Sequence, residues 1–233
     1  MSESEIKQQV RHFYDQVGWQ VGDDGLYQNA RYEDLRPVAR DYIHRCHLRV
    51  RQFLKPTGRF LLDAGSGPIQ YPEYLVYSEG YRYRVCADLS MVALREAHRR
   101  IDGKGLFVVA DIANLPFKAG VFEGEVSLHM IHHLPPQDHL KVYEEFYRVL
   151  APSGAAVLVN GWSYSPLMNR MKGLVWLMDK VLGLKARLRK PASSGQTDKD
   201  SLRADSGVSP KKAGVPTGTY VKAFDAGWMV EHL

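Results

Sequence analysis

Three apolar runs of this 233-residue chain each end in an aspartate, a side chain that accepts hydrogen bonds from hydroxyl and amino groups. The first of them, Asp63, precedes Gly65 and Gly67, two glycines that let the backbone turn tightly and approach a ligand. Amides exposed in such a loop can meet a carboxylate or a phosphate. Asp88 follows 21 positions after Gly67, where a carboxylate can accept hydrogen bonds from both hydroxyls of a ribose.

The third aspartate, Asp111, precedes Ile112 and the turn Leu115–Phe117. Its carboxylate can accept a hydrogen bond from an adenine amino group while the apolar neighbour flanks the ring. Each feature alone also has a structural explanation. Glycine turns follow many strands, Asp88 precedes a helix whose dipole favours an acid, and Asp111 suits an ordinary loop. Their order at three successive strand ends favours a site for an adenosine-containing ligand.

The elements that must position these residues alternate between strands and helices. Apolar runs bounded by turn residues predict five buried parallel strands, at 59–63, 84–87, 106–110, 121–128 and 155–160. Helical spacing and end signals predict helices at 4–16, 36–54, 72–79, 90–100 and 138–150. This alternation predicts an α/β fold with a doubly wound, Rossmann-like sheet. Ligands bind outside the carboxyl ends of such strands, where the three aspartates lie.

With these motifs, residues 58–162 resemble class I S-adenosylmethionine (SAM)-dependent methyltransferases, especially the branch that acts on small molecules. The glycine loop, the two nucleoside aspartates and the turn at Arg148–Gly154 carry the resemblance. It implies an enzyme that transfers a methyl group from SAM. The residues implied to bind SAM are Asp63, Gly65, Ser66, Gly67, Asp88, Leu89, Asp111, Ile112, Leu128 and, from an N-terminal cover, Tyr14.

Three histidines follow the fourth predicted strand, in the segment that the resemblance places beside the transferred methyl. His129, His132 and His133 are the candidate catalytic residues, because any of them can take a proton from an acceptor or line its pocket. The alternative is that this segment only packs against the cofactor. No carboxylate or further ligand is suitably spaced around these histidines, so no metal is expected.

The resemblance also divides the chain into a helical cover (1–57), a SAM-binding core (58–162) and a C-terminal part (163–233). The last part is expected to hold helical segments and a mobile loop at 191–219. Ile69 occupies the usual third glycine position of the family. The antiparallel strand pair that normally completes the family sheet is expected to be missing, so the chain is expected to be a fragment or a shortened variant.

The composition of the chain limits the kinds of partner and the compartment that we expect. The hydrophobic fraction is 45%, the charged fraction 24% and the net charge +5, which is typical of a globular protein. Two cysteines, and no apolar stretch of the roughly 18–20 residues that a membrane span requires, favour a cytoplasmic protein. Basic residues are scattered along the sequence. Base-amino methyltransferases have an acid or amide before two prolines and an aromatic residue after them, whereas this chain has Leu134 and Gln137 at those positions. We therefore expect a small-molecule acceptor, no nucleic acid, and a monomer or homodimer.

Two other classes of protein fit part of the sequence. A nicotinamide-dependent oxidoreductase would use the same architecture, but it expects a third glycine after Gly67 and has no use for Asp111. A non-catalytic binding protein derived from a methyltransferase is consistent with the expected loss of the last strands. The intact Asp63 and Asp88 argue against that alternative.

Overall fold

A computed structural model describes residues 2–22, 27–28, 37–160, 167, 170–174, 176–178, 180, 219–221 and 231. The chain divides into two compact units, one of residues 1–161 with 218–233 and one of 162–217. The strands and the candidate site belong to the first unit. The predicted loop at 191–219 and the predicted absence of a final strand pair concern residues that lie almost wholly outside the described ranges.

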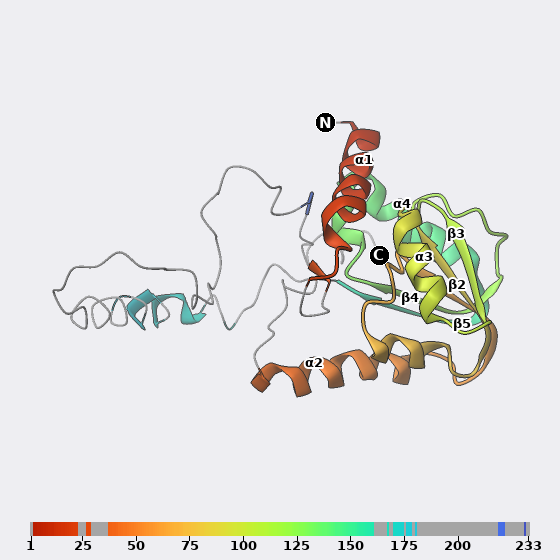
Figure 1. Cartoon of the computed structure of the whole chain (residues 1–233), viewed down its shortest axis with the longest axis horizontal. Coiled ribbons are helices and arrows are strands. Elements are labelled where there is room, and N and C mark those ends of the chain that lie inside the picture. The colour runs from red at the N-terminus through yellow and green to blue at the C-terminus, as the bar shows by residue number, and fades with distance from the viewer. Residues whose placement is uncertain are drawn as a thin grey trace. The chain divides into compact units, whose positions relative to one another are not determined.

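Five parallel strands form one sheet, which confirms the predicted fold (Figure 1). They are β1 (Gly58–Ala64), β2 (Tyr81–Asp88), β3 (Gly105–Val109), β4 (Phe122–Leu128) and β5 (Leu150–Val159). Their order in the sheet is β3-β2-β1-β4-β5. The order reverses between β1 and β4, so loops leave these two central strands in opposite directions. In open sheets of this kind, ligands bind at that point.

Helices cover both faces of the sheet. One face carries α2 (Pro37–Arg49), the 3-10 helices η3 (Val50–Phe53) and η4 (Pro72–Ser78), and α3 (Met91–Arg100). The other face carries α4 (Pro136–Val149), and the short 3-10 helix η5 (Ile131–His133) precedes it. Buried side chains from both faces of β1 and β2 form the core, which explains why these strands are apolar on both sides.

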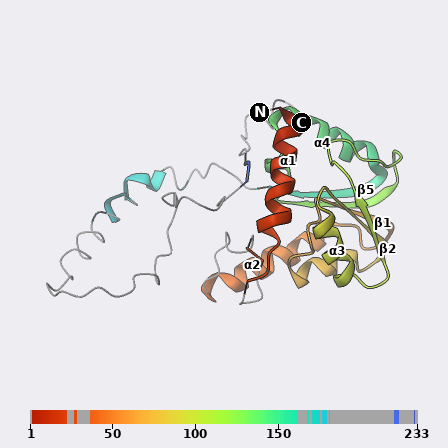
Figure 2. The same cartoon turned by 45° about the horizontal axis from the view of Figure 1, so that its top comes forward.

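An N-terminal helix, α1 (Glu3–Phe13), begins at a capping box in which Ser2 and Glu5 satisfy each other's backbone amides. It continues into a π-helical turn, η1 (Tyr14–Gly18). Figures 1 and 2 both show α1 beside the sheet at the edge where the strands end. The predicted N-terminal helix is therefore present. No helix within the described ranges combines the length and the apolar character needed to cross a membrane.

A buried ion pair joins the two central strands β1 and β2. Arg84 of β2 and Asp63 of β1 are 1% and 4% exposed, and both Nε and a terminal nitrogen of the guanidinium donate to Asp63 Oδ2, at 3.0 and 2.5 Å. The other terminal nitrogen of Arg84 donates to the Tyr74 carbonyl. The guanidinium thus ties both strands to η4, which follows the glycine loop.

Removing one member of this pair leaves the other charge buried without compensation. We expect Asp63→Asn to lower the free energy of unfolding by about 3–5 kcal/mol in urea denaturation. The matched control Arg99→Ala breaks the exposed Arg99–Glu96 pair and is expected to cost less than about 1 kcal/mol. The double variant Asp63→Leu/Arg84→Met should recover part of the loss. Equal costs for Asp63→Asn and the control would contradict this account.

Candidate active site

The glycine loop leaves the carboxyl end of β1 in a left-handed backbone conformation. Gly65 and Gly67 have φ values of +71° and +54°. The Gly65 amide donates to the carbonyl of Ala87 in β2 at 2.7 Å, which holds the loop against the next strand. A Cβ on Gly65 would lie 2.2 Å from Met130 Cγ, so a larger residue does not fit there.

Ile69 adopts the backbone conformation that a glycine would favour. Its φ is +55°, which is rare for a β-branched residue, and its side chain is 1% exposed. Arg100 donates to its carbonyl at 2.9 Å. The loop therefore keeps a glycine-like course at the family's third glycine position, and burial of the side chain offsets part of the backbone strain.

Asp88 closes the glycine loop from the end of β2. Its Oδ2 accepts a hydrogen bond from the Gly67 amide at 2.9 Å, and its Oδ1 accepts one from the Ser90 amide at 2.8 Å. Burial raises the pKa of this carboxyl to about 6, against the lowering effect of the two amides. Each carboxylate oxygen has a second lone pair, so the group can still accept hydrogen bonds from two ligand hydroxyls.

Asp111 follows β3 and faces the N-terminal helix. Its Oδ1 accepts from the Ala113 amide at 3.0 Å, and Lys7 Nζ of α1 donates to its Oδ2 at 2.5 Å. The same ammonium lies 2.5 Å from Oδ2 of Asp138, whose side chain is 1% exposed. Lys7 thus neutralises two carboxylates, one of them the predicted adenine acid.

The histidine segment follows β4 at the same edge. His129 has a φ of +54°, and its amide donates to the Val159 carbonyl of β5 at 2.6 Å. The His133 ring lies between Tyr14 and Tyr220. Its Nε2 is 2.8 Å from the Tyr14 hydroxyl and its Nδ1 is 2.9 Å from the Tyr220 carbonyl oxygen. His132 has a buried Nδ1 without a hydrogen-bond partner among the described residues.

Burial keeps all three imidazoles neutral at pH 7. It lowers the pKa of His129 and of His133, and together with the neighbouring His133 it lowers the pKa of His132 to about 4. A neutral imidazole can accept a proton or a hydrogen bond, whereas an imidazolium can only donate. The segment can therefore accept a proton from an acceptor group, but the lowered pKa values weaken these imidazoles as bases, His132 above all.

The N-terminal segment contacts the end of every strand from β1 to β4. Lys7 reaches Asp111, the Asp15 carboxylate accepts from Ser90 Oγ, and Tyr14 reaches His133. The Trp19 ring stacks on Tyr14 with centroids 4.8 Å apart and lies over the glycine loop, 3.1 Å from where a Cβ of Gly67 would be. Its buried Nε1 has no hydrogen-bond partner among the described residues, so this donor is left unsatisfied in a ring that lies over the glycine loop.

The sequence places the segment from His12 to Trp19, which includes Asp15, over the cofactor with Tyr14 as the expected contact, but Lys7 was missed. A signal for Lys7 was available, because a residue seven positions before Tyr14 lies on the same face of a helix. The individual contacts of Asp15 and Trp19 could not be predicted, since the π-helical turn of η1 shifts the spacing after Tyr14. The site is thus as much a product of the N-terminal segment as of the strand ends.

The structure brings most of the predicted binding residues to this edge but places three of them in its supports. Asp63 is committed to Arg84 below the loop, and Ile112 is 0% exposed within the core beside α4. Leu128 packs into the cluster under α2. The buried Ser66 hydroxyl donates to the Gly67 carbonyl at 3.3 Å, and Leu89 is half-buried after Asp88. Direct contact of these residues with a cofactor stays a prediction.

The remaining groups fit the nucleoside part of SAM. Asp88 and Asp111 are acceptors at adjacent strand ends, which suits the hydroxyls of a ribose and the amino group of an adenine. The Trp19 and Tyr14 rings offer apolar surface beside them. The buried indole N–H of Trp19 is a further donor for a ligand acceptor.

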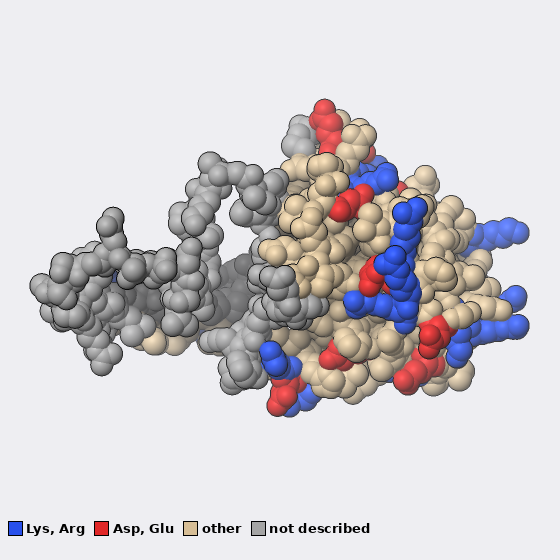
Figure 3. Space-filling view, viewed as in Figure 1, with Lys and Arg blue, Asp and Glu red and all other residues tan. Residues whose placement is uncertain are grey.

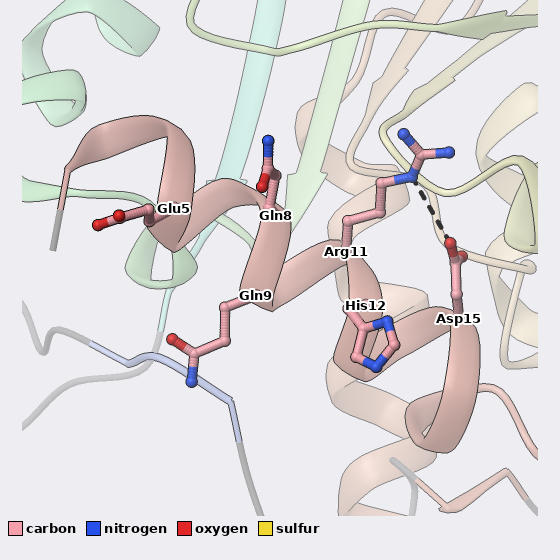
Figure 4. A pocket seen from close by; sticks show the side chains of 6 residues that line it. All are labelled: Glu5, Gln8, Gln9, Arg11, His12 and Asp15. Atoms are coloured by element: carbon pink, nitrogen blue, oxygen red, sulfur yellow. Dashed lines mark ion pairs between the residues drawn. The ribbon is translucent and has the colours of Figure 1, made fainter.

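A separate shallow depression of about 530 Å³ runs along the outer side of α1 and η1. The described residues that line it are Glu5, Gln8, Gln9, Arg11, His12 and Asp15 (Figure 4). They form one wall, and Figure 4 shows their side chains spread along the helix with only the Arg11–Asp15 ion pair joining them. The depression lacks the converging groups of the strand ends.

Within the described ranges, no cluster of three His, Cys, Asp or Glu side chains is arranged to hold a metal ion.

Comparisons with known proteins define the class of this domain. Residues 62–158 match the family described as "Methyltransferase domain". Two solved structures share the fold. Phosphoethanolamine N-methyltransferase 1 of Haemonchus contortus aligns with a TM-score of 0.57 at 15% identity, over 70% of this chain and 34% of that one. Geranyl diphosphate C-methyltransferase of Streptomyces coelicolor aligns with a TM-score of 0.52 at 17% identity, over 67% and 65%.

The fold, the glycine loop and the strand-end acids are those of a Rossmann-like methyltransferase domain. Residues 62–158 thus form a methyltransferase domain of the Rossmann-like type, which agrees with the resemblance to class I SAM-dependent methyltransferases that the sequence predicted. Among curated proteins, the chain is 31% identical over 132 residues to "Probable tRNA methyltransferase 9B" of Mus musculus, which is 54% of this chain and 28% of that protein. It is 32% identical over 119 residues to "tRNA (carboxymethyluridine(34)-5-O)-methyltransferase" of Arabidopsis thaliana, or 49% and 27%. The matches thus span less than a third of these relatives.

These relatives contradict the predicted partners, a small-molecule acceptor and no nucleic acid, because their names specify tRNA. The prediction treated the basic residues as scattered, although Arg45 and Arg49, four positions apart in the predicted helix at 36–54, share one face of it. It also relied on a motif of base-amino methyltransferases, which says nothing about methylation at other positions of an RNA.

The contact between the glycine loop and the histidine segment can be tested by substitution. Gly65 and Gly120 have similar φ values, +71° and +67°, but a Cβ on Gly120 would meet nothing within 4 Å. Gly120→Ala therefore measures the backbone cost alone, roughly 1–2 kcal/mol. We expect Gly65→Ala to lower the free energy of unfolding by more than this in urea denaturation, because it also displaces Met130.

The excess cost should shrink in a Met130→Ala background, since the two side chains then no longer collide. Equal costs for Gly65→Ala and Gly120→Ala, or a cost of Gly65→Ala that Met130→Ala does not change, would contradict the close packing of the loop on Met130.

Proposed function

We propose that this chain binds SAM at the carboxyl edge of the sheet and transfers its methyl group to an RNA of the tRNA class. The observation that carries the cofactor half of the proposal is the convergence of the glycine loop, Asp88 and Asp111 at neighbouring strand ends. The acceptor half rests on the curated relatives, whose names specify tRNA.

In this proposal, Asp88 accepts hydrogen bonds from the ribose and the glycine loop lies against the part of the cofactor beyond it. Asp111 accepts a hydrogen bond from the adenine amino group after Lys7 has released it. Lys7 can then remain paired with Asp138. The rings of Trp19 and Tyr14 cover the site and exclude water. SAM supplies a methyl group that its sulfonium already activates, so positioning of the acceptor provides much of the rate.

His129, His132 and His133 are proposed to line the acceptor side of the site. The Tyr14 hydroxyl and the Tyr220 carbonyl fix the orientation of the His133 ring. His132 retains a buried nitrogen that can accept a proton from an acceptor hydroxyl or amine, or hold a hydrogen bond to it. Because its pKa is about 4, we assign His132 a hydrogen-bonding role in preference to that of a strong base.

We expect the full chain to transfer label from methyl-tritiated SAM to total tRNA, measured as acid-insoluble, ribonuclease-sensitive counts. Asp88→Asn should reduce the rate at least about tenfold, since the loss of one charged hydrogen bond costs about 1.5–3 kcal/mol. Asp102→Asn is the matched control, because Asp102 is exposed and distant from the strand ends, and it should leave the rate unchanged.

Absence of ribonuclease-sensitive label from a chain that binds S-adenosylhomocysteine would overturn the RNA acceptor and leave the cofactor site standing. Equal rates for Asp88→Asn and Asp102→Asn would overturn the assignment of the site.

A further inference from the structure

One described segment of this chain is strongly positive. Residues 37–55, which form α2, η3 and the turn after them, hold five Lys and Arg residues and one acidic residue. Their net charge is +4, while the whole chain carries +5. The basic side chains over α3, seen in Figure 3, have acidic side chains among them, and Glu96 pairs with both Arg99 and Arg100. The α2 segment is therefore the more strongly positive of the two helical surfaces.

Two arginines and two aromatic rings line up on the outer side of this segment. Tyr42, Arg45 and Arg49 follow one another at positions i, i+3 and i+7, which places them on one face of α2, and Phe53 of η3 lies beside Arg49. Tyr42 and Phe53 are 65% and 58% exposed, although aromatic rings of this size are usually buried. The Arg49 guanidinium lies 5.9 Å from the centre of the Phe53 ring. We name these four residues the α2 stripe.

Neither arginine of the α2 stripe forms an ion pair with any residue that the structure describes. The opposite side of the helix is occupied, since His44 contacts Glu73 and the His47 ring packs 4.6 Å from Tyr71. α2 packs on η4 and on its own continuation η3, and Figure 1 shows its outer side turned away from the sheet. The α2 stripe thus presents two exposed rings and positive charge that no described residue neutralises.

We propose that the α2 stripe binds a single-stranded part of the RNA acceptor, with guanidinium groups on phosphates and aromatic rings against bases. This inference rests on the proposed function. Charge complementarity identifies the occupant, because arginines alternating with exposed aromatic rings match the phosphates and base faces of single-stranded RNA. An acidic protein surface would be attracted by the two arginines, but its binding would not explain why Tyr42 and Phe53 are exposed.

The position of the helix connects the α2 stripe to the active site. His47 lies on the inner side of α2, where it contacts Tyr71 and Tyr74 beyond the glycine loop. Burial lowers the pKa of His47, and the charge of nearby His129 adds to this lowering. One helix therefore borders the acceptor side of the site with one face and offers the α2 stripe with the other. An RNA held on the outer face has its neighbouring nucleotides within reach of the site.

The test compares two charge-matched double variants of the full chain. Arg45→Gln/Arg49→Gln removes two charges from the α2 stripe, and Arg95→Gln/Arg99→Gln removes two exposed charges from α3. Binding of a fluorescent single-stranded RNA is measured by anisotropy over a range of salt concentrations. We expect the slope of log affinity against log salt to fall by about 1.4 for the α2 variant, since each phosphate contact contributes about 0.7. The α3 variant should keep the slope of the unaltered chain.

A third variant tests the rings. Tyr42→Ala/Phe53→Ala should weaken RNA binding by at least about fivefold with an unchanged salt slope, because stacking contributes about 1–3 kcal/mol per base. All variants should bind S-adenosylhomocysteine as the unaltered chain does, which shows that they fold and keep the cofactor site.

The outcomes separate this proposal from the proposed function. If the unaltered chain methylates tRNA but the α2 and α3 variants bind RNA equally well, the α2 stripe proposal is overturned and the function stands. If the unaltered chain does not methylate tRNA, yet only the α2 variants weaken RNA binding, the proposed reaction fails and the binding surface is supported. Absence of RNA binding by the unaltered chain overturns the α2 stripe proposal.

Discussion

Parallel pairing of β1 with both β2 and β4 is the constraint on which the rest of the structure depends. The register places Asp63 opposite Cys86 of β2 and opposite Val126 of β4, so three strands end at the same height. The glycine loop, the ribose acid and the histidine segment then have to meet at one edge, although they are far apart in sequence. Asp88 reinforces this arrangement, because it receives amides from the glycine loop and from the start of α3.

The N-terminal segment covers this edge of the sheet. It contributes a cation at Lys7, an anion at Asp15 and the stacked rings of Tyr14 and Trp19, each opposite a different strand end. These contacts are polar and local, so they can be exchanged for contacts with a ligand at small cost. The buried Arg84–Asp63 pair lies beneath them and stays out of that exchange. The site thus combines a rigid base with a cover whose contacts can be replaced.

Much of the fold could be predicted from the sequence, because buried parallel strands are apolar on both faces and helices carry end signals such as Pro72 and Ser90. The strand-end aspartates were predictable for the same reason. The pairing of Asp63 with Arg84 was not, since it depends on the register of two strands. The charge on one face of α2 was readable, because Arg45 and Arg49 lie four positions apart in the predicted helix at 36–54, but the basic residues were treated as scattered. That error led to the wrong exclusion of nucleic acid.

The central claim is that Asp88, as a carboxylate, binds the ribose of the methyl cofactor at the common edge of the strands. Calorimetric titration of the full chain with S-adenosylhomocysteine between pH 8 and pH 5 tests it most directly. Since the pKa of Asp88 is about 6, the group is charged above that pH and neutral below it. We expect the affinity to be constant from pH 8 to 7 and to fall as the pH drops through 6, whereas Asp88→Asn should bind weakly at every pH in this range. Binding by Asp88→Asn that is as tight as that of the unaltered chain, or no binding by the folded unaltered chain at pH 8, would contradict the account.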